Sequence, residues 1–223
     1  MDLILYGLQR SGTNFIEKVF TERYRVNFIN QNNDRACPAA KHFRLYDNKD
    51  IVPEPGYRNN VRIENYTFLE KQLKAVPNFC VVISKDPYSW LLSYEKWAQR
   101  CNWAPVCHHY IEEYNLFYAK WLEFAKQTDK IVFIRYIDLL YDIKQELKRL
   151  EKLMRLKRKL SAFFAEPRYK LVPQSEEFTQ DCLDYYLEQQ YFAKYSKERL
   201  EEVNGHLDAN VMLGLGYTIK QSI

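Results

Sequence analysis

The sequence lacks the features that mark several common classes of protein. Its apolar runs, such as Phe79 to Ile83, are far shorter than the roughly 20 residues that a membrane-spanning helix needs, so we expect no transmembrane segment. The first residues also lack the basic region and small-residue cleavage site of a secretory signal. We therefore expect a chain that starts at Met1 and works in the cytoplasm.

Cysteine is scarce and is not spaced for a structural role. Five cysteines, an odd number spread along 223 residues, do not form a disulfide framework, which suits a reducing compartment. Cys101 and Cys107 lie close to His108 and His109, but no CxxC pair accompanies them. We interpret this segment as a surface loop and expect no metal site.

Charge of one sign is not in large excess either. The formal net charge of +4 permits an anionic ligand but does not indicate binding to nucleic acid. The basic stretch from Lys144 to Lys159 alternates with leucines, which is typical of the solvated face of an amphipathic helix. With no internal repeat and no linker composition, residues 1–223 are expected to form a single domain.

Short apolar runs alternate along the chain with segments of helical periodicity. The predicted strands are Leu3 to Tyr6, Phe79 to Ile83 and Ile131 to Arg135. Helices are predicted from Phe15, over Phe68 to Ala75, from Ser89, over Tyr110 to Gln127, from Asp138 towards Met154, and over Ser175 to Val203. This alternation predicts an α/β fold of three layers, with a mainly parallel central sheet, flanking helices, and ligands at the carboxyl ends of the strands. Residues 30 to 65 are interpreted as an extended surface region.

A glycine-containing loop follows the first predicted strand and reads GLQRSGTN over residues 7–14. Its two glycines have the spacing of a Walker A loop, but Thr13 and Asn14 stand where a nucleoside triphosphatase has Lys and Ser or Thr. Without that lysine, the loop is poorly suited to hydrolysis of ATP or GTP. Arg10 lies inside the loop instead, so the sequence predicts an anion-binding loop at a helix start.

A second polar motif follows the strand at Phe79 to Ile83 and reads SKDPYSWLLSY over residues 84–94. Pro87 suits the first turn of a helix. Lys85 lies at the strand end and Ser93 on the predicted helix, eight positions later. The sequence alone leaves open whether these two side chains meet.

The two motifs together resemble those of the sulfotransferases that use 3′-phosphoadenosine 5′-phosphosulfate (PAPS). That family has a basic residue before Ser-Gly-Thr or Ser-Gly-Ser, and later a basic residue with Pro at a strand end and a Ser eight positions on. Residues Ile131 to Leu140 are similar to a third family segment, its later strand and Tyr-Glu-Asp-Leu. The chain lacks the Arg-Lys-Gly and Gly-x-Trp-Lys elements of cytosolic members, which favours a bacterial or carbohydrate-type member. The resemblance implies a P-loop NTPase-like sulfotransferase fold and metal-independent sulfuryl transfer that leaves adenosine 3′,5′-bisphosphate (PAP).

The resemblance also assigns residues to the two ends of the donor. The expected contacts are Arg10, Ser11, Gly12, Thr13 and Asn14 at the 5′-phosphosulfate, and Lys85 and Ser93 at the 3′-phosphate. Lys85 stands where the family more often has Arg, so it offers a point charge instead of a bidentate fork. Candidates for covering the adenine are Trp90, Arg168 and Lys170.

For the catalytic base, histidine has the pKa best matched to proton transfer near neutral pH. His42 is the candidate, because the segment AAKHF lies between the two motifs and resembles the Lys-His segment of the family. Lys41 would be a nearby cation, and Arg10 would assist at the leaving phosphate. His108 or His109 is the alternative base.

The acceptor is not encoded in any motif, because acceptor pockets are built by variable loops. We favour a carbohydrate hydroxyl, since the aromatic residues after the second motif could stack on sugar rings; they are Trp97, Trp103, Tyr110 and Tyr114. A small phenol, a lipid headgroup or a peptide tyrosine are the alternatives, and the oligomeric state is open.

The sequence also leaves two functions other than sulfuryl transfer open. One is a P-loop nucleotide or small-molecule kinase, and the other is a non-catalytic nucleotide- or RNA-binding module that uses the basic stretch from Lys144 to Lys159.

Overall fold

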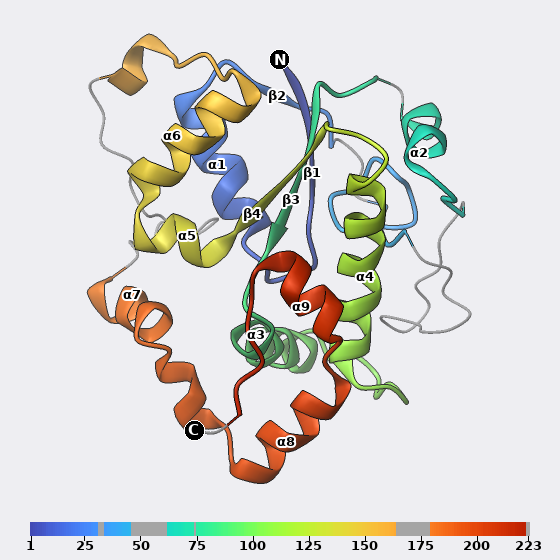
Figure 1. The fold of residues 1–223 in the computed structure, drawn as a ribbon, viewed down its shortest axis with the longest axis vertical. Coiled ribbons are helices and arrows are strands. Elements are labelled where there is room, and N and C mark those ends of the chain that lie inside the picture. Colours follow the sequence, from blue (N-terminus) through green and yellow to red (C-terminus); the bar gives the residue numbers. More distant parts are fainter. Residues whose placement is uncertain (31–33, 46–61, 74, 164–178, 222–223) are drawn as a thin grey trace.

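A four-stranded parallel sheet runs through the middle of the molecule (Figure 1). The computed structural model describes residues 1–30, 34–45, 62–73, 75–163 and 179–221. The strands are β1 (Asp2–Tyr6), β2 (Asn27–Phe28), β3 (Phe79–Ser84) and β4 (Ile131–Arg135), in the order β2-β1-β3-β4. The three predicted strands are confirmed, and the chain has the predicted α/β class with helices on both faces of a parallel sheet.

The helices form the two outer layers of the fold. They are α1 (Thr13–Arg23), α2 (Tyr66–Gln72), α3 (Pro87–Arg100), α4 (Tyr110–Ala125), α5 (Tyr136–Tyr141), α6 (Ile143–Met154), α7 (Gln180–Leu187), α8 (Lys197–His206) and α9 (Ala209–Leu215), with short 3₁₀ turns η1 (Leu160–Phe163) and η2 (Gln190–Lys194). One hydrophobic core contains side chains of α1, α5 and α6, and the other contains side chains of α2, α3, α4, α8 and α9. Figure 1 shows these two groups on opposite sides of the sheet.

The position of β3 in the sheet explains why its residues 79–83 are all apolar. Cys80 and Val82 belong to the core on one face of the sheet, and Val81 and Ile83 belong to the core on the other. All four side chains are fully buried. A strand that is covered on both faces loses the polar alternation of a half-exposed strand, so the continuous apolar run is a reliable sign of the strand's central place.

Two predicted helices are interrupted in the structure. The helix expected from Asp138 towards Met154 breaks at Asp142, whose extended backbone ends α5 and whose side chain caps α6 by accepting from the Gln145 amide. The helix expected over Ser175 to Val203 is described from residue 179 onward and consists of α7, η2 and α8. A left-handed residue, Gln189, lies between the first two of these. Helical periodicity continued across both breaks, so it did not reveal them.

The expectation of an exposed region over residues 30 to 65 is wrong for part of its described portion. Phe43 and Leu45 are buried in the core that contains α3 and α4.

In the described part of the chain, no helix is both long enough and apolar enough to cross a membrane.

The carboxyl ends of β1, β3 and β4 bring three segments to one edge of the sheet. Gly7 follows β1, Lys85 follows β3 and Tyr136 follows β4. These strands are neighbours and run parallel, so their ends lie together, as expected for ligand sites in open α/β sheets.

Candidate functional site

The loop between β1 and α1 is folded tightly around Gly7 and Ser11. The Ser11 hydroxyl donates to the Leu8 carbonyl at 2.7 Å, and the Ser11 amide donates to the same oxygen at 3.1 Å. A Cβ added to Gly7 would lie 2.6 Å from the Ser11 Oγ and 2.9 Å from a methyl group of Ile83, so only glycine fits there. Ser11 is fully buried. Its hydroxyl therefore holds the shape of the loop.

Helix α1 begins without a capping side chain. Its N-cap, Gly12, has a positive φ of 98°, and no side chain of the described residues accepts a hydrogen bond there. The first N–H groups of a helix have no intrahelical partner, and they carry the positive end of its dipole. The start of α1 is therefore suited to hold a phosphate-like anion.

Arg10 also adopts a left-handed backbone conformation, with φ 70°. Such a conformation is costly for a residue with a side chain and is found most often at functional sites. The side chain is exposed, and its guanidinium carbon lies 5.3 Å from the centre of the Trp97 ring. Arg10 thus extends from the loop towards α3.

Lys85 and Ser93 meet in the structure. Asp86 caps α3 by accepting from the amides of Tyr88 and Ser89, so the helix begins immediately after the strand and folds back over its end. The Lys85 Nζ then donates to the Ser93 Oγ at 2.9 Å, and to the hydroxyl of Tyr186 at 3.0 Å. The structure therefore answers the question that the sequence left open.

The Lys85 ammonium group is buried among neutral partners. Its residue is 4% exposed, and its Nζ lies 4.6 Å from the ring centre of Tyr186 and 5.7 Å from that of Tyr136. Burial, and then the nearby Arg10 cation, lowers the pKa of Lys85 to about 7, with Asp86 opposing the shift. Among the described residues Lys85 forms no ion pair, so its position is suited to receive a negatively charged ligand.

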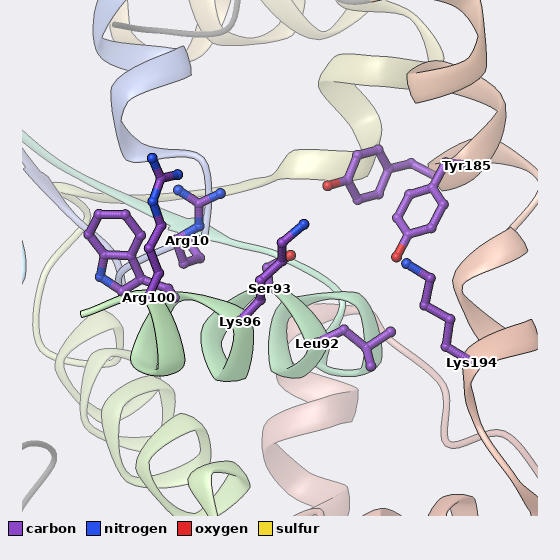
Figure 2. A pocket seen from close by; sticks show the side chains of 9 residues that line it. Arg10, Leu92, Ser93, Lys96, Arg100, Tyr185 and Lys194 are labelled. Carbon is purple, nitrogen blue, oxygen red and sulfur yellow. The ribbon is translucent and has the colours of Figure 1, made fainter. Parts of the chain in front are cut away.

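Two cavities open beside these residues. The inner cavity, of about 140 Å³, is lined by Arg10, Gly12, Thr13, Asn14, Phe15, Lys85, Tyr136 and Tyr186. The outer cavity, of about 340 Å³, is lined by Arg10, Leu92, Ser93, Lys96, Trp97, Arg100, Tyr185, Tyr186 and Lys194. Figure 2 shows the outer cavity, with Ser93 and Lys96 on α3 and with Tyr185 and Lys194 facing them from α7 and η2. Arg10 and Tyr186 belong to both cavities.

Positive charge dominates both cavities. In the described part of the chain, none of the side chains that line them is acidic. Among the same described residues, no carboxylate forms an ion pair with Arg10, Lys96 or Arg100. The arrangement is therefore chemically suited to anionic ligands.

His42 lies against Gly7, the first residue of the loop between β1 and α1. Its Nδ1–H donates to the Gly7 carbonyl at 2.8 Å, while the Gly7 amide donates to the Lys41 carbonyl at 3.1 Å. Burial is the main cause that lowers the pKa of His42 to about 3; the bond to the Gly7 carbonyl opposes this shift, and the cations of Arg44, Lys41 and Arg35 add to it. The ring is therefore neutral near pH 7, with Nε2 unprotonated.

The predicted cation Lys41 is engaged by α1. Its Nζ donates to Asn14 at 2.7 Å and forms an ion pair with Glu17 at 2.8 Å. Neither Lys41 nor His42 is among the described side chains that line the two cavities. Both lie directly behind the loop.

The alternative bases have structural partners. The His108 Nε2 bonds to Glu113 at 2.9 Å, and Glu113 also pairs with the fully buried Arg44 at 3.2 Å. His109 caps α4 by accepting from the Ile111 amide through its Nδ1. His108 and His109 are therefore hydrogen-bonded, as His42 is, and none of the three is among the described residues that line the two cavities.

The structure corrects several of the aromatic candidates. Trp90 is fully buried and donates its indole N–H to the Gln9 carbonyl, so it does not face an adenine. Tyr114 is also fully buried. Trp103 packs on the ring of Tyr94, and Tyr110 does the same. Of the four residues proposed to stack on a sugar, Trp97 lines a cavity. Arg168 and Lys170 lie outside the described residues.

The structure also adds residues that the sequence did not single out: Lys96, Arg100, Tyr185, Tyr186 and Lys194. Lys96, Trp97 and Arg100 follow Ser93 by three, four and seven positions, which places them on one face of a helix. That spacing was a usable signal. Tyr185, Tyr186 and Lys194 reach the site only through the packing of α7 and η2, so no local pattern indicated them.

Comparison with known proteins gives little beyond these observations. No protein-family model matches the sequence, and no curated protein matches it. Among solved structures, the fold is similar to mouse sulfotransferase SULT7A1 complexed with PAP, with a TM-score of 0.49 and 13% sequence identity. The match covers 96% of this chain and 85% of that one. A likeness of this degree carries no functional conclusion, so the case for a function rests on the side chains around the two cavities.

Proposed function

We propose that this chain is a sulfotransferase that moves a sulfuryl group from PAPS to an acceptor hydroxyl. The observation that carries the proposal is the bond from Lys85 to Ser93, beside an inner cavity that the uncapped start of α1 also lines. These are two separate anion-binding elements at one edge of the sheet. They suit a nucleotide that bears one phosphate at its 5′ position and another at its 3′ position.

The residues divide between these two ends of the donor. We assign the 5′-phosphosulfate to Arg10 and to the start of α1 at Gly12, Thr13 and Asn14, and the 3′-phosphate to Lys85 and Ser93. Ser11 contributes by holding the loop in shape. A phosphate beside the buried ammonium group would raise the pKa of Lys85 again, so the cost of burying that charge is recovered when the donor binds.

The composition of the site favours sulfuryl transfer over a kinase reaction. Magnesium in nucleotide sites is held by one or two carboxylates together with the phosphates, whereas the described lining of both cavities contains no carboxylate. Thr13 also occupies the position of the Walker lysine. We therefore propose that fixed cations, without a metal ion, offset the charge on the leaving group.

The transfer requires a proton acceptor as well as cations. The donor supplies the sulfuryl group, whose bond to the 5′-phosphate oxygen breaks as the acceptor oxygen bonds to sulfur. We assign the acceptor proton to the Nε2 of His42, since its Nδ1–H is held by the Gly7 carbonyl; this role requires the acceptor hydroxyl to reach the ring, which lies outside the described lining of both cavities. Its low pKa makes it a weak base in the free protein, and the negative charge of a bound donor would raise that pKa. Arg10 offsets the charge on the departing phosphate.

A carbohydrate hydroxyl is the acceptor that we propose. Trp97 in the outer cavity offers an aromatic side chain of the kind that packs against sugar rings.

The two hydrophobic cores share one sheet, which supports the proposal that residues 1–223 form a single domain.

The proposal is tested by calorimetric titration of PAP, in buffer that contains EDTA, into the wild type and into Lys85→Ala and Ser93→Ala. We expect metal-free binding, with a loss of about 100-fold for Lys85→Ala because a charge-assisted contact disappears. We expect a smaller loss for Ser93→Ala. Parallel titrations use ATP with Mg²⁺ and a single-stranded RNA. No binding of PAP, together with binding of ATP and Mg²⁺ or of RNA, would replace the proposal with the corresponding alternative.

The role of His42 has its own test once PAP binding is established. His42→Gln should bind PAP as the wild type does, because the imidazole does not line the inner cavity. It should lose most of the transfer of radiolabelled sulfuryl from PAPS to any acceptor that a screen identifies, since a general base typically contributes about 100-fold or more. Equal transfer by His42→Gln and the wild type would remove His42 from the mechanism.

A further inference from the structure

The segment from Tyr141 to Leu160 carries an excess of positive charge that the proposed donor site does not use. It contains eight lysines and arginines against three acidic residues, an excess of five, whereas the whole chain has a formal net charge of +4. None of its residues is among the described side chains that line the two cavities. Locally concentrated charge of one sign attracts partners of the opposite sign, so this segment could bind an anionic partner of its own.

The three acidic residues of this segment are engaged in local contacts. Asp142 caps the start of α6. Glu146 pairs with Arg149, and Glu151 pairs with Arg158, each at 2.6 Å. The carboxylates of the segment are therefore occupied in holding α6 and the chain around it in place.

Three lysines form a row along the outward face of α6. Lys144, Lys148 and Lys152 are exposed and are spaced by four residues, which places them on one side of a helix. We call these three residues the basic row. The other side of α6 is buried in the core that contains α1. Among the described residues, neither Lys148 nor Lys152 forms an ion pair. Like charges at this spacing weaken a helix, so folding does not account for the row.

Exposed apolar side chains accompany the basic row. In the described part of the chain, six large apolar side chains are strongly exposed, and three of them lie in this segment. Leu153 on α6 is 51% exposed, Leu160 at the start of η1 is 73% exposed, and Tyr141 at the end of α5 is 81% exposed. Leucine side chains add nothing to contacts with a phosphate backbone, whereas apolar side chains beside lysines suit the boundary between lipid headgroups and acyl chains.

On these observations we propose that the outward face of α6 docks on the surface of an anionic lipid bilayer. The basic row contacts the negatively charged headgroups, and Leu153 and Leu160 enter the boundary between headgroups and acyl chains. Helix α6 lies in the layer on the opposite side of the sheet from α3 (Figure 1). The docking surface is therefore separate from the proposed donor site, and the inference does not depend on the proposed function.

The test is co-sedimentation of the full chain with vesicles of phosphatidylcholine, prepared with and without phosphatidylserine. The charge variant replaces every lysine of the basic row with glutamine. Its control removes three exposed cations from other parts of the chain and is Lys71→Gln/Lys126→Gln/Lys197→Gln. We expect the wild type to bind the vesicles that contain phosphatidylserine and not those without it. The charge variant should bind them about 100-fold more weakly, at about fivefold per lysine, and the control should stay close to the wild type.

A second pair of variants tests the insertion of leucines. Leu153→Gln/Leu160→Gln should weaken binding to the same vesicles by about tenfold, because apolar surface that enters the bilayer is lost. The control Val76→Gln/Leu213→Gln changes two exposed apolar side chains outside the segment and should match the wild type. Equal binding by the leucine variant and this control would overturn the insertion.

The remaining outcomes overturn the inference in distinguishable ways. If the wild type binds both kinds of vesicle equally or neither, or if the charge variant and its control behave alike, the basic row is not a docking site for anionic lipid. A single-stranded RNA is titrated in parallel. Binding of RNA that the charge variant loses and the leucine variant keeps, without binding to vesicles, would assign the face to nucleic acid. Loss of PAP affinity in the charge variant would assign the row to the donor site.

Discussion

The inner and outer cavities share Arg10 but hold positive charge in opposite ways. In the inner cavity, Lys85 is 4% exposed and bonds to the neutral hydroxyls of Ser93 and Tyr186. In the outer cavity, Lys96 and Arg100 are exposed to solvent. Burial of a charge is expensive unless a partner is present, whereas an exposed charge costs little. The buried charge of the inner site therefore lowers the stability of the free protein in favour of ligand affinity, whereas the exposed cations of the outer site cost the protein almost no stability.

The largest expected effect is on the stability of the unliganded protein. Lowering the pKa of Lys85 from 10.5 to about 7 corresponds to a cost on the order of 5 kcal/mol when the group is protonated. The hydrogen bonds lost in Lys85→Met offset about 2 kcal/mol of that. At pH 6, Lys85→Met should therefore be more stable than the wild type by about 3 kcal/mol, as measured by urea denaturation.

The matched control is Lys96→Met, the same change at an exposed position, which should stay within about 0.5 kcal/mol of the wild type. The advantage of Lys85→Met should shrink as the pH rises. Between pH 7 and 10.5 the unfolded chain binds a proton that the folded chain does not, so the stability of the wild type increases over that window. A Lys85→Met variant that is less stable than the wild type at pH 6 would contradict the contrast between the two cavities.

A second prediction concerns the backbone of the inner cavity. Gly12 has φ 98°, and a Cβ there would lie 2.6 Å from the ring of Tyr136. Gly12→Ala should therefore destabilise the protein by about 2 to 4 kcal/mol, through left-handed strain and overpacking. It should also abolish PAP binding, because the start of α1 must shift. Thermal unfolding and calorimetry measure the two effects.

The control for Gly12→Ala is Gly205→Ala on α8, where an added Cβ meets nothing within 4 Å. That change should stabilise the protein slightly, since alanine is the better helix former by up to about 1 kcal/mol. Equal PAP affinity in Gly12→Ala and the wild type would show that the loop is only a strand-to-helix turn.

The two cavities also differ in how far the sequence predicted them. Segments of the inner cavity follow strand ends, and a parallel sheet places neighbouring strand ends together. The loop at Gly12 and the residue Lys85 were therefore found from local patterns, and a buried strand such as β3 was legible from its apolar run. The sequence alone did not show in which direction α3 runs from the end of β3. The contact between Lys85 and Ser93 could therefore be predicted only from the family resemblance, and the structure shows it.

Apart from Arg10, the residues of the outer cavity come from α3, α7 and η2, which meet only through tertiary packing. The helix face that carries Lys96 and Arg100 was visible as a spacing but resembled any solvated face. Tyr186 lies in the part of the chain where periodicity predicted one long helix, and that helix is broken at Gln189, which has a left-handed backbone conformation. The prediction that Trp90 covers the adenine was wrong, because Trp90 is buried in the core. No local sequence pattern distinguishes a tryptophan of the core from one that lines a cavity.

The third prediction is a pH dependence confined to the inner cavity. Because the pKa of Lys85 is about 7 in the free protein and rises beside a phosphate, PAP binding above pH 7 must take up a proton. Affinity should fall by about tenfold per pH unit above 7, until the pKa of the complex is reached. Calorimetry in buffers of different ionisation enthalpy measures this proton uptake directly.

Lys85→Arg is the decisive variant for that prediction, because arginine keeps its charge at every accessible pH. It should bind PAP with no dependence on pH between 7 and 9, and with no proton uptake. Lys96→Arg, the same substitution in the outer cavity, should retain the pH dependence of the wild type. If Lys85→Arg and the wild type share one pH profile, another group carries the proton.

The smallest expected effect is the response to salt. Exposed charges are screened by ions, and the screening length falls from about 10 Å at 0.1 M to about 3 Å at 1 M. Any contribution of Lys96 and Arg100 to PAP affinity, measured as the loss in Lys96→Gln/Arg100→Gln, should therefore shrink several-fold over this range. The contribution of Lys85, measured as the loss in Lys85→Ala, should change less, because Lys85 is buried and salt does not enter between it and a bound phosphate. Equal salt sensitivity of the two contributions would contradict the distinction between buried and exposed cations, which would then have no energetic basis.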